Sequence, residues 1–232
     1  ESVNIEVRVN ESVPGQFGLS IRQCVLVEVE VTVPQRKPAQ FVGGGDWNNL
    51  DTHAPTLYRE RMVFTWAPLN VDNFADLDEL FARPGGHIVK QCYCVWFRER
   101  GGAGQIPNIE RRPFLLTLAQ GDLPPGILGY EDDVVVGWAS LGPRHDFVRL
   151  ERSRVMKQVD DQPVWSLPCF YVDRQWRGRG IATKLLKAAQ EFAIANNAET
   201  LEAYPVDRAD RTPPDSAFYG LKTMFDKQGF VE

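Results

Sequence analysis

The stretch QWRGRG, residues 175–180, places two glycines between arginines directly before a segment of helical periodicity. Glycine permits a turn with positive φ, and the absence of a Cβ lets the backbone approach a bulky anion closely. The helix that follows presents unpaired backbone N–H groups at the positive end of its dipole. These residues favour a phosphate-binding loop, with an ordinary strand-to-helix turn and solvated arginines as the alternative.

Two common nucleotide-binding loops differ from this stretch in spacing. The dinucleotide fingerprint G-x-G-x-x-G accommodates Gly178 and Gly180, but Thr183 stands in the position of its third glycine. The nucleoside-triphosphate loop needs four residues between its glycines and a Gly-Lys-Ser/Thr ending, whereas here Thr183 precedes Lys184. Neither motif is therefore present, and a nucleotide-binding protein of another class stays as one alternative.

The elements around the loop follow the order strand, loop, helix, strand, helix. Residues 162–172 and 199–207 read as strands, and an apolar stripe that begins at Ile181 predicts an amphipathic helix. Residues 215–230 predict a second helix, with Asp215 or Ser216 as its N-cap and Gly229 as its stop signal.

The pattern of apolar and polar residues upstream of the loop changes near residue 60. Residues 3–10 and 24–33 alternate apolar and polar side chains, which predicts two half-buried strands, and a Gly-rich segment follows them. We therefore place a domain boundary near residue 60. The remaining patterns predict a helix over 71–83, a strand over 87–100, a short helical pattern over 106–121 that Pro113 breaks, and a hairpin over 126–142 with an acidic turn at 131–133.

Residues 175–182, QWRGRGIA, resemble the Q/R-x-x-G-x-G/A signature of the GNAT superfamily of acyl-coenzyme A-dependent N-acyltransferases. Residues 225–230, FDKQGF, are similar to its terminal Y-x-K-x-G-F element, with Phe225 in the position of the tyrosine. The resemblance implies an α/β (α+β) fold for residues 61–232, with a mixed, mainly antiparallel central sheet flanked by helices. Residues 1–60 are then an N-terminal β-rich extension of unknown role, whose strands or a partner chain would pair with the open sheet edge.

The resemblance also implies acetyl-CoA as the cosubstrate and no metal. In this superfamily the strand before the loop diverges from its neighbour and pairs with the pantetheine arm, while the loop binds the pyrophosphate. An amine then attacks the thioester directly, a base removes its proton, and an acid protonates the departing thiolate. The coenzyme-binding residues implied are Phe170, Tyr171, Val172, Gln175, Trp176, Arg177, Gly178, Arg179, Gly180, Ile181, Ala182 and Thr183.

The acid and the base are less defined, because Phe225 cannot donate a proton. Tyr219 is the candidate acid, and Tyr171 and Tyr204 are further phenols expected near the cleft. Glu202 is the candidate base, with Asp207 or a chain of water molecules as alternatives. The charged segment 142–165 would overhang the acceptor side or form a solvated loop, and it contains His145, which we expect to be exposed.

Composition narrows the class of partner. A formal charge of −5 argues against broad binding to nucleic acid or acidic membranes, and no apolar run approaches the roughly 20 residues of a bilayer span. Cys92 and Cys94 would share one face of a strand, but the sequence offers no second ligand pair for zinc, so packed thiols are expected. We therefore predict a cytoplasmic N-acetyltransferase for a small-molecule amine, with a homodimer as one option and a non-catalytic acyl-CoA sensor or scaffold as the alternative.

Overall fold

A computed structural model describes residues 13–14, 20–21, 24–26, 63–207 and 218–231. Its described strands form a seven-stranded sheet in the order β4-β5-β6-β7-β8-β3-β9, antiparallel except between β7 and β8, and a separate two-stranded sheet of β1 and β2. This confirms the predicted fold class. The strands are β1 Val13–Pro14, β2 Ser20–Ile21, β3 Cys24–Leu26, β4 Phe64–Pro68, β5 Gly126–Glu131, β6 Val134–Pro143, β7 Trp165–Val172, β8 Leu201–Ala203 and β9 Phe230–Val231.

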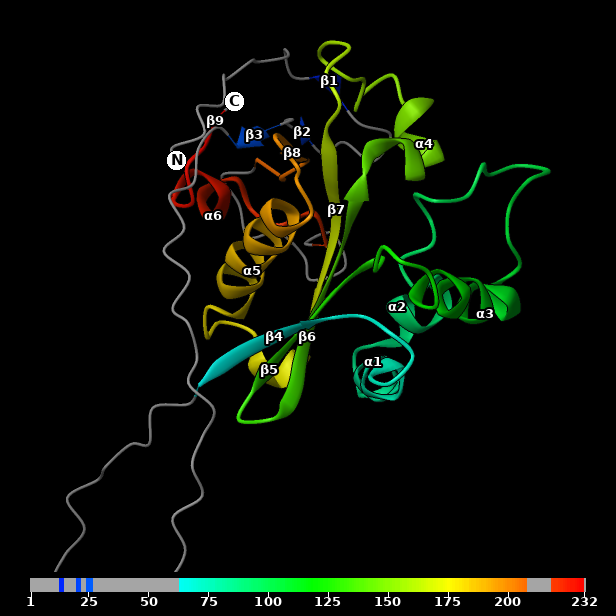
Figure 1. Ribbon diagram of the computed structural model, residues 1–232, viewed down its shortest axis with the longest axis vertical. Helices are drawn as coiled ribbons and strands as arrows, with labels where there is room; N and C mark the ends of the chain where they lie inside the picture. The colour runs from blue at the N-terminus through cyan, green and yellow to red at the C-terminus, as the bar shows by residue number, and fades with distance from the viewer. Residues whose placement is uncertain (1–12, 15–19, 22–23, 27–62, 208–217, 232) are drawn as a thin grey trace, which may run out of the picture.

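Helices cover both faces of this sheet (Figure 1). One apolar cluster packs α5 against the sheet through residues such as Ile127 and Val136, and a second packs α1 to α3 through Leu128 and Val135. Neighbouring strand residues thus face opposite layers, as the period of two requires. The helices are α1 Phe74–Ala82, α2 His87–Cys92, α3 Asn108–Ala119, α4 Val148–Glu151, α5 Ile181–Ala195 and α6 Lys222–Asp226, with short 3-10 turns η1 Arg144–Asp146 and η2 Arg174–Trp176.

The hairpin of β5 and β6 brings the sheet close to α5. Its turn residues Asp132 and Asp133 have positive φ, as two-residue hairpins require, which confirms the predicted acidic turn. Gly129 and Gly137 are partners across the two strands, and a Cβ on Gly137 would lie 2.6 Å from Leu185 Cδ1. The paired glycines therefore let α5 lie nearer to the sheet than larger residues would allow.

Strands β7 and β8 separate after a short parallel contact. Their register runs from Trp165 opposite Leu201 to Leu167 opposite Ala203 and then ends. Pro168 follows the last pair in one strand and Pro205 lies two residues beyond it in the other, and neither has an N–H to donate to a ladder. The β7 edge over residues 168–172 is therefore free of β8.

Two predictions upstream of the hairpin are wrong. Residues 87–100 do not form a strand: α2 covers His87–Cys92, and Tyr93 and Cys94 then adopt positive φ. The apolar run is too short for its periodicity to separate a helix from a strand. Pro113 does not break its helix but lies inside α3, because proline has a helical φ and removes only one helical hydrogen bond at this position.

The predictions for the two ends hold in part. A segment of the N-terminal region does pair with the side of β8 that β7 leaves open, and this segment, β3, is antiparallel to both β8 and β9. The predicted strand over 3–10 and the N-caps Asp215 and Ser216 lie outside the described residues. In its described part the predicted helix over 215–230 is confirmed as an α-helix only for α6, because Gly220, with a φ of +78°, separates a 3-10 turn at Phe218 and Tyr219 from α6. None of the described helices combines the length and hydrophobicity that a bilayer crossing requires.

Candidate active site

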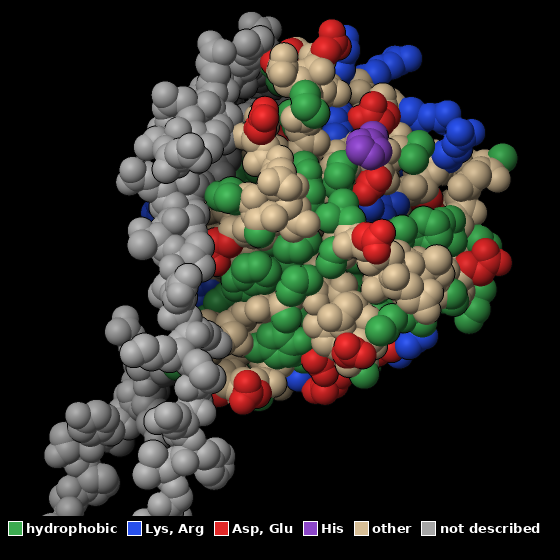
Figure 2. Space-filling model, viewed as in Figure 1, with side chains coloured by type: hydrophobic (Ala, Val, Ile, Leu, Met, Phe, Trp, Pro, Cys, Tyr) green, Lys and Arg blue, Asp and Glu red, His purple; other side chains and the backbone are tan. Residues whose placement is uncertain are grey.

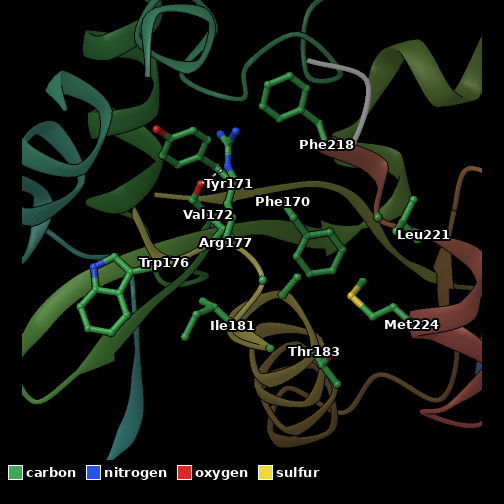
Figure 3. A pocket seen from close by; sticks show the side chains of 14 residues that line it. Phe170, Tyr171, Val172, Trp176, Arg177, Ile181, Thr183, Phe218, Leu221 and Met224 are labelled. Atoms are coloured by element: carbon green, nitrogen blue, oxygen red, sulfur yellow. Dashed lines mark hydrogen bonds between the residues drawn. The ribbon is translucent and has the colours of Figure 1, made fainter. Parts of the chain in front are cut away.

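A cavity of about 390 Å³ opens where β7 leaves β8 and the chain turns into α5. Figure 3 shows the side chains of Phe170, Leu221 and Met224 gathered on one side of it, with Ile181 and Thr183 on the first turn of α5. The cavity is thus lined by strand β7, the glycine loop, the start of α5, and the chain from Phe218 to Met224 in α6. Its lining residues are Phe170, Tyr171, Val172, Trp176, Arg177, Gly178, Gly180, Ile181, Ala182, Thr183, Phe218, Gly220, Leu221 and Met224.

The predicted coenzyme residues match this lining except for Gln175 and Arg179. Gln175 lies in η2 and its backbone N–H donates to Asp173 Oδ1 at 2.8 Å. Arg179 places its guanidinium 5.0 Å from the centre of the Trp176 ring. The sequence did not indicate the residues contributed by the chain before α6, because they follow a helix pattern that the structure does not adopt there.

The glycine loop has the backbone geometry of an anion site. Gly178 and Gly180 have φ of +76° and +80°, and a Cβ built on either would meet no atom within 4 Å. Gly180 is the N-cap of α5, and no side chain caps the helix. The first-turn N–H groups, which have no partner within the helix itself, therefore point from a positive dipole end toward open space.

An ion pair that the sequence did not indicate fixes the start of this loop. Asp173 is buried, and its second oxygen, Oδ2, accepts from Arg83 Nη1 at 2.8 Å. Arg83 also donates to Val135 O at 2.7 Å, so the end of α1, strand β6 and the loop share one guanidinium. Asp173 is recognisable in hindsight as an aspartate that turns the chain before η2, since aspartates commonly bond backbone N–H groups two residues on.

Successive side chains of β7, the strand that lines the cavity, point to opposite sides of the sheet. Phe170 and Val172 pack on the α5 side, whereas the side chain of Tyr171 points away from α5 (Figure 3). The ring centroids of Tyr171 and Phe81 lie 5.6 Å apart, and the two rings pack edge to face. Burial raises the pKa of Tyr171, and its hydroxyl has no hydrogen-bond partner among the described residues. Arg177 donates from Nε to Val172 O at 3.0 Å and so lies along the same wall.

Phe225 is a packing residue in this structure. It is fully buried, and its ring lies 6.0 Å from the Phe170 ring and 5.0 Å from the Phe230 ring. It does not line the cavity, where Met224 and Leu221 take that part of the wall. Phe225 therefore supports strand β7 from behind.

Glu202, the candidate base, belongs to a buried network and is the partner of Ser166 in the middle of the parallel contact of β7 and β8. Its Oε1 accepts from Arg144 Nη1, Ser166 Oγ and Tyr204 OH. Arg144 is itself buried and donates to Glu151 Oε1 at 3.0 Å. Burial raises the pKa of Tyr204 well above its ordinary value. The structure thus places Glu202 and Tyr204 in a neutralised core network, outside the cavity lining.

Tyr219, the candidate acid, lies in a third apolar cluster beside the cavity. The ring centroids of Tyr219 and Phe97 lie 6.1 Å apart with the rings edge to face. Tyr219 is not part of the cavity lining. Burial, aided by the nearby Cys169 and Cys92 sulfurs, raises the pKa of Tyr219 to about 12. Its hydroxyl is therefore protonated at neutral pH.

The charged segment between β6 and β7 combines a buried and a solvated side. Phe147, Leu150 and Met156 are buried against Tyr204, whereas the side chain of His145 is 83% exposed, as predicted. Figure 2 shows Lys and Arg side chains gathered at the upper right, where Figure 1 places α4. The segment is therefore anchored through its apolar residues and the buried Arg144, while other charged side chains of the segment point outward.

The described cysteine side chains are arranged differently from the prediction. Cys92 and Cys94 flank the end of α2 rather than sharing a strand face, and Cys94 contacts Cys169 of β7. Among the residues that the structure describes, no group of three or more His, Cys, Asp or Glu side chains could hold a metal ion.

Comparison with known proteins agrees with this geometry. The profile of the acetyltransferase (GNAT) family matches residues 71–213, more than half of the chain. No curated protein matches the sequence significantly. The chain therefore belongs to the GNAT acetyltransferase family, a class of acyl-CoA-dependent N-acyltransferases, on the strength of the family match.

Solved structures of similar fold come from the same class. An aminoglycoside N-acetyltransferase, AAC(6')-Iy, in complex with CoA has a TM-score of 0.48 and 18% identity, covering 76% of this chain and 93% of its own. A ribosomal-protein-alanine N-acetyltransferase from Brucella melitensis biovar Abortus 2308 has a TM-score of 0.40 and 14% identity, covering 73% and 93%. Their acceptors differ, and at these identities they leave the acceptor of this chain open.

Proposed function

We propose that this protein transfers the acetyl group of acetyl-CoA to a primary amine of a small molecule. The observation that carries the proposal is the cavity at the start of α5, whose lining contains nearly all the residues expected to hold the coenzyme. We also propose that residues 61–232 form the catalytic domain, with residues 1–60 as an extension, and that the protein acts in the cytoplasm, with a homodimer as one option.

Coenzyme A fits both the anion-binding loop and the free strand edge with its apolar surroundings in this cavity. Its diphosphate is an anion, for which the N–H groups at residues 178–182 and Arg177 supply donors and positive charge. Its pantetheine arm carries amide groups on an otherwise flexible chain, which can pair with the β7 edge that β8 leaves free. Phe170, Leu221 and Met224 supply apolar surface beside that edge.

The proposed reaction is a direct acyl transfer. The lone pair of a neutral amine attacks the thioester carbonyl carbon, the C–S bond breaks, and the sulfur departs as a thiolate with the bonding pair. Backbone N–H donors of β7 would stabilise the oxyanion. Glu202 and Tyr219 remain our candidates for base and acid, and since neither lines the cavity, protons would reach them through water.

A thermal-shift comparison tests the coenzyme class. We expect CoA to raise the Tm and NAD and ATP to leave it unchanged, because a ligand that binds only the folded state stabilises it. A Tm that rises with NAD or ATP but not with CoA would contradict the proposal.

A panel of amines then tests catalysis. With acetyl-CoA present, we expect thiol release that depends on at least one primary amine among polyamines, amino acids and aminoglycosides. A protein that binds CoA but releases no thiol with any amine would instead be the non-catalytic sensor or scaffold. Substitution of Tyr219 by Phe and of Glu202 by Gln would then compare the pH profiles of a working enzyme.

A further inference from the structure

Two cysteines from distant parts of the chain meet beside the cavity. The Sγ atoms of Cys94 and Cys169 lie 3.3 Å apart although 75 positions separate them in sequence, and both are free thiols. Cys169 directly precedes Phe170 in β7, and Cys94 follows the end of α2. The contact therefore joins the helical layer to the strand that forms the cavity wall.

The two thiols differ in accessibility. Cys94 is buried, at 3% exposure, within the cluster under α1 to α3, whereas Cys169 is only partly buried. The contact with Cys169, followed by burial, raises the pKa of Cys94 well above its ordinary value. Cys94 thus keeps its proton at neutral pH, and Cys169, which is less buried, is the member of the pair that a small oxidant can reach.

We propose that Cys94 and Cys169 form a redox modification site that closes into a reversible disulfide. In the first step the Cys169 sulfur attacks hydrogen peroxide, which breaks the O–O bond and yields a sulfenic acid and one water. In the second step the Cys94 sulfur attacks the sulfenic sulfur, and the hydroxyl leaves with the Cys94 proton as a second water. Peroxide is the oxidant, and both sulfurs are oxidised.

The geometry suits this closure. A disulfide needs a sulfur separation of about 2.05 Å, so the thiols must approach by little more than an ångström. Cys94 lies in a turn whose residues Tyr93 and Cys94 have positive φ, outside the regular part of α2, so this turn can move without disturbing a helix. The bond would tie that turn to β7 next to Phe170.

The experiment treats the full chain with hydrogen peroxide and maps its peptides without reduction. We expect a linked pair of peptides that contain Cys94 and Cys169, the loss of two thiols, and recovery of both with dithiothreitol. The oxidised protein should also have a higher Tm than the reduced one, because a cross-link across 75 positions restricts the unfolded chain.

Three variants distinguish this pair from the other thiols. Cys92→Ser, whose thiol lies at the other end of the same turn, should form the link as the wild type does. Cys94→Ser should stop at a sulfenic acid on Cys169 that dimedone traps, and Cys169→Ser should leave Cys94 unmodified. The proposal is overturned if the wild type forms no link, if the link uses Cys92 or Cys24, or if Cys94 is oxidised without Cys169.

Discussion

Phe225 occupies a position of the family motif but has a packing role in this structure. It fills the position of the family's tyrosine by resemblance, yet it is fully buried between the rings of Phe170 and Phe230. A hydroxyl added there would be surrounded by apolar atoms. The site therefore does not depend on a proton donor at this position.

Restoring the tyrosine tests this view. We expect Phe225→Tyr to lower the free energy of unfolding by about 1–3 kcal/mol, because its hydroxyl would be buried without a partner. The rate of amine-dependent thiol release should not rise. Urea denaturation and initial rates measure the two effects, and an increase in kcat would show that the position accepts an acid.

Tyr219 makes stability depend on pH in the alkaline range. Burial raises its pKa from 10.0 to about 12, so between these values the unfolded chain loses this proton while the folded protein keeps it. The unfolded state then binds fewer protons, and the free energy of unfolding falls as pH rises from 10.0 to about 12.

The measurement is chemical denaturation at several pH values with Tyr219→Phe as the comparison. The variant should show a shallower fall over this window, because it removes one of the groups that titrate. Equal slopes for the two proteins would mean that the Tyr219 hydroxyl is as accessible in the folded state as in the unfolded one.

At the scale of elements, the packing of α5 on the β5–β6 hairpin positions the glycine loop at the start of α5. Gly137→Ala places a Cβ 2.6 Å from Leu185 Cδ1 and 3.1 Å from Tyr171 O, so the Leu185 side chain or the neighbouring backbone must shift. We expect a loss of about 1–3 kcal/mol of unfolding free energy from this overpacking.

A matched control lies in the same strand. A Cβ at Gly142 would have no neighbour closer than 3.5 Å, so Gly142→Ala should cost much less stability than Gly137→Ala. Thermal denaturation of the two variants decides this. Equal losses would mean that the strand backbone, and not the approach of α5, limits both positions.

Elements with strong local patterns were predictable, and contacts between distant residues were not. The apolar stripe along α5 and the acidic turn after β5 each depend on residues that are close in sequence, so periodicity and turn residue types indicate them. The six-residue α2 is too short for its period to decide. The pair of Arg83 and Asp173 joins positions 90 apart, which no local pattern encodes.

The candidate site follows the same division. The glycine loop and the strand before it were predicted because close anion approach leaves a local signature in residue type. The contribution of Phe218 to Met224 depends on how the chain returns to the cavity before α6, a tertiary arrangement. The burial of Glu202 likewise arises from its pairing with Arg144, 58 positions away.

For the whole molecule, the N-terminal region and the family domain share one sheet. β3 lies between β8 and β9, so removal of residues 1–26 would leave an unpaired edge next to the buried network of Glu202. We expect this truncated protein to have a lower Tm and to aggregate more. Removal of residues 1–12 alone, which keeps all the described residues, is the control. Equal Tm values for the two truncations would mean that β3 adds nothing to the sheet.

The account as a whole depends on CoA binding at the glycine loop, and calorimetric titration of CoA into glycine variants tests it most directly. Gly178→Val and Gly180→Val should weaken binding by about tenfold or more, a cost of about 1.4 kcal/mol, because a side chain would fill the space over the N–H groups. Gly102→Val is the matched control, since Gly102 also has positive φ and open space around its Cβ but lies outside the cavity. Unchanged CoA affinity in both loop variants, or an equal loss in the control, would contradict the account.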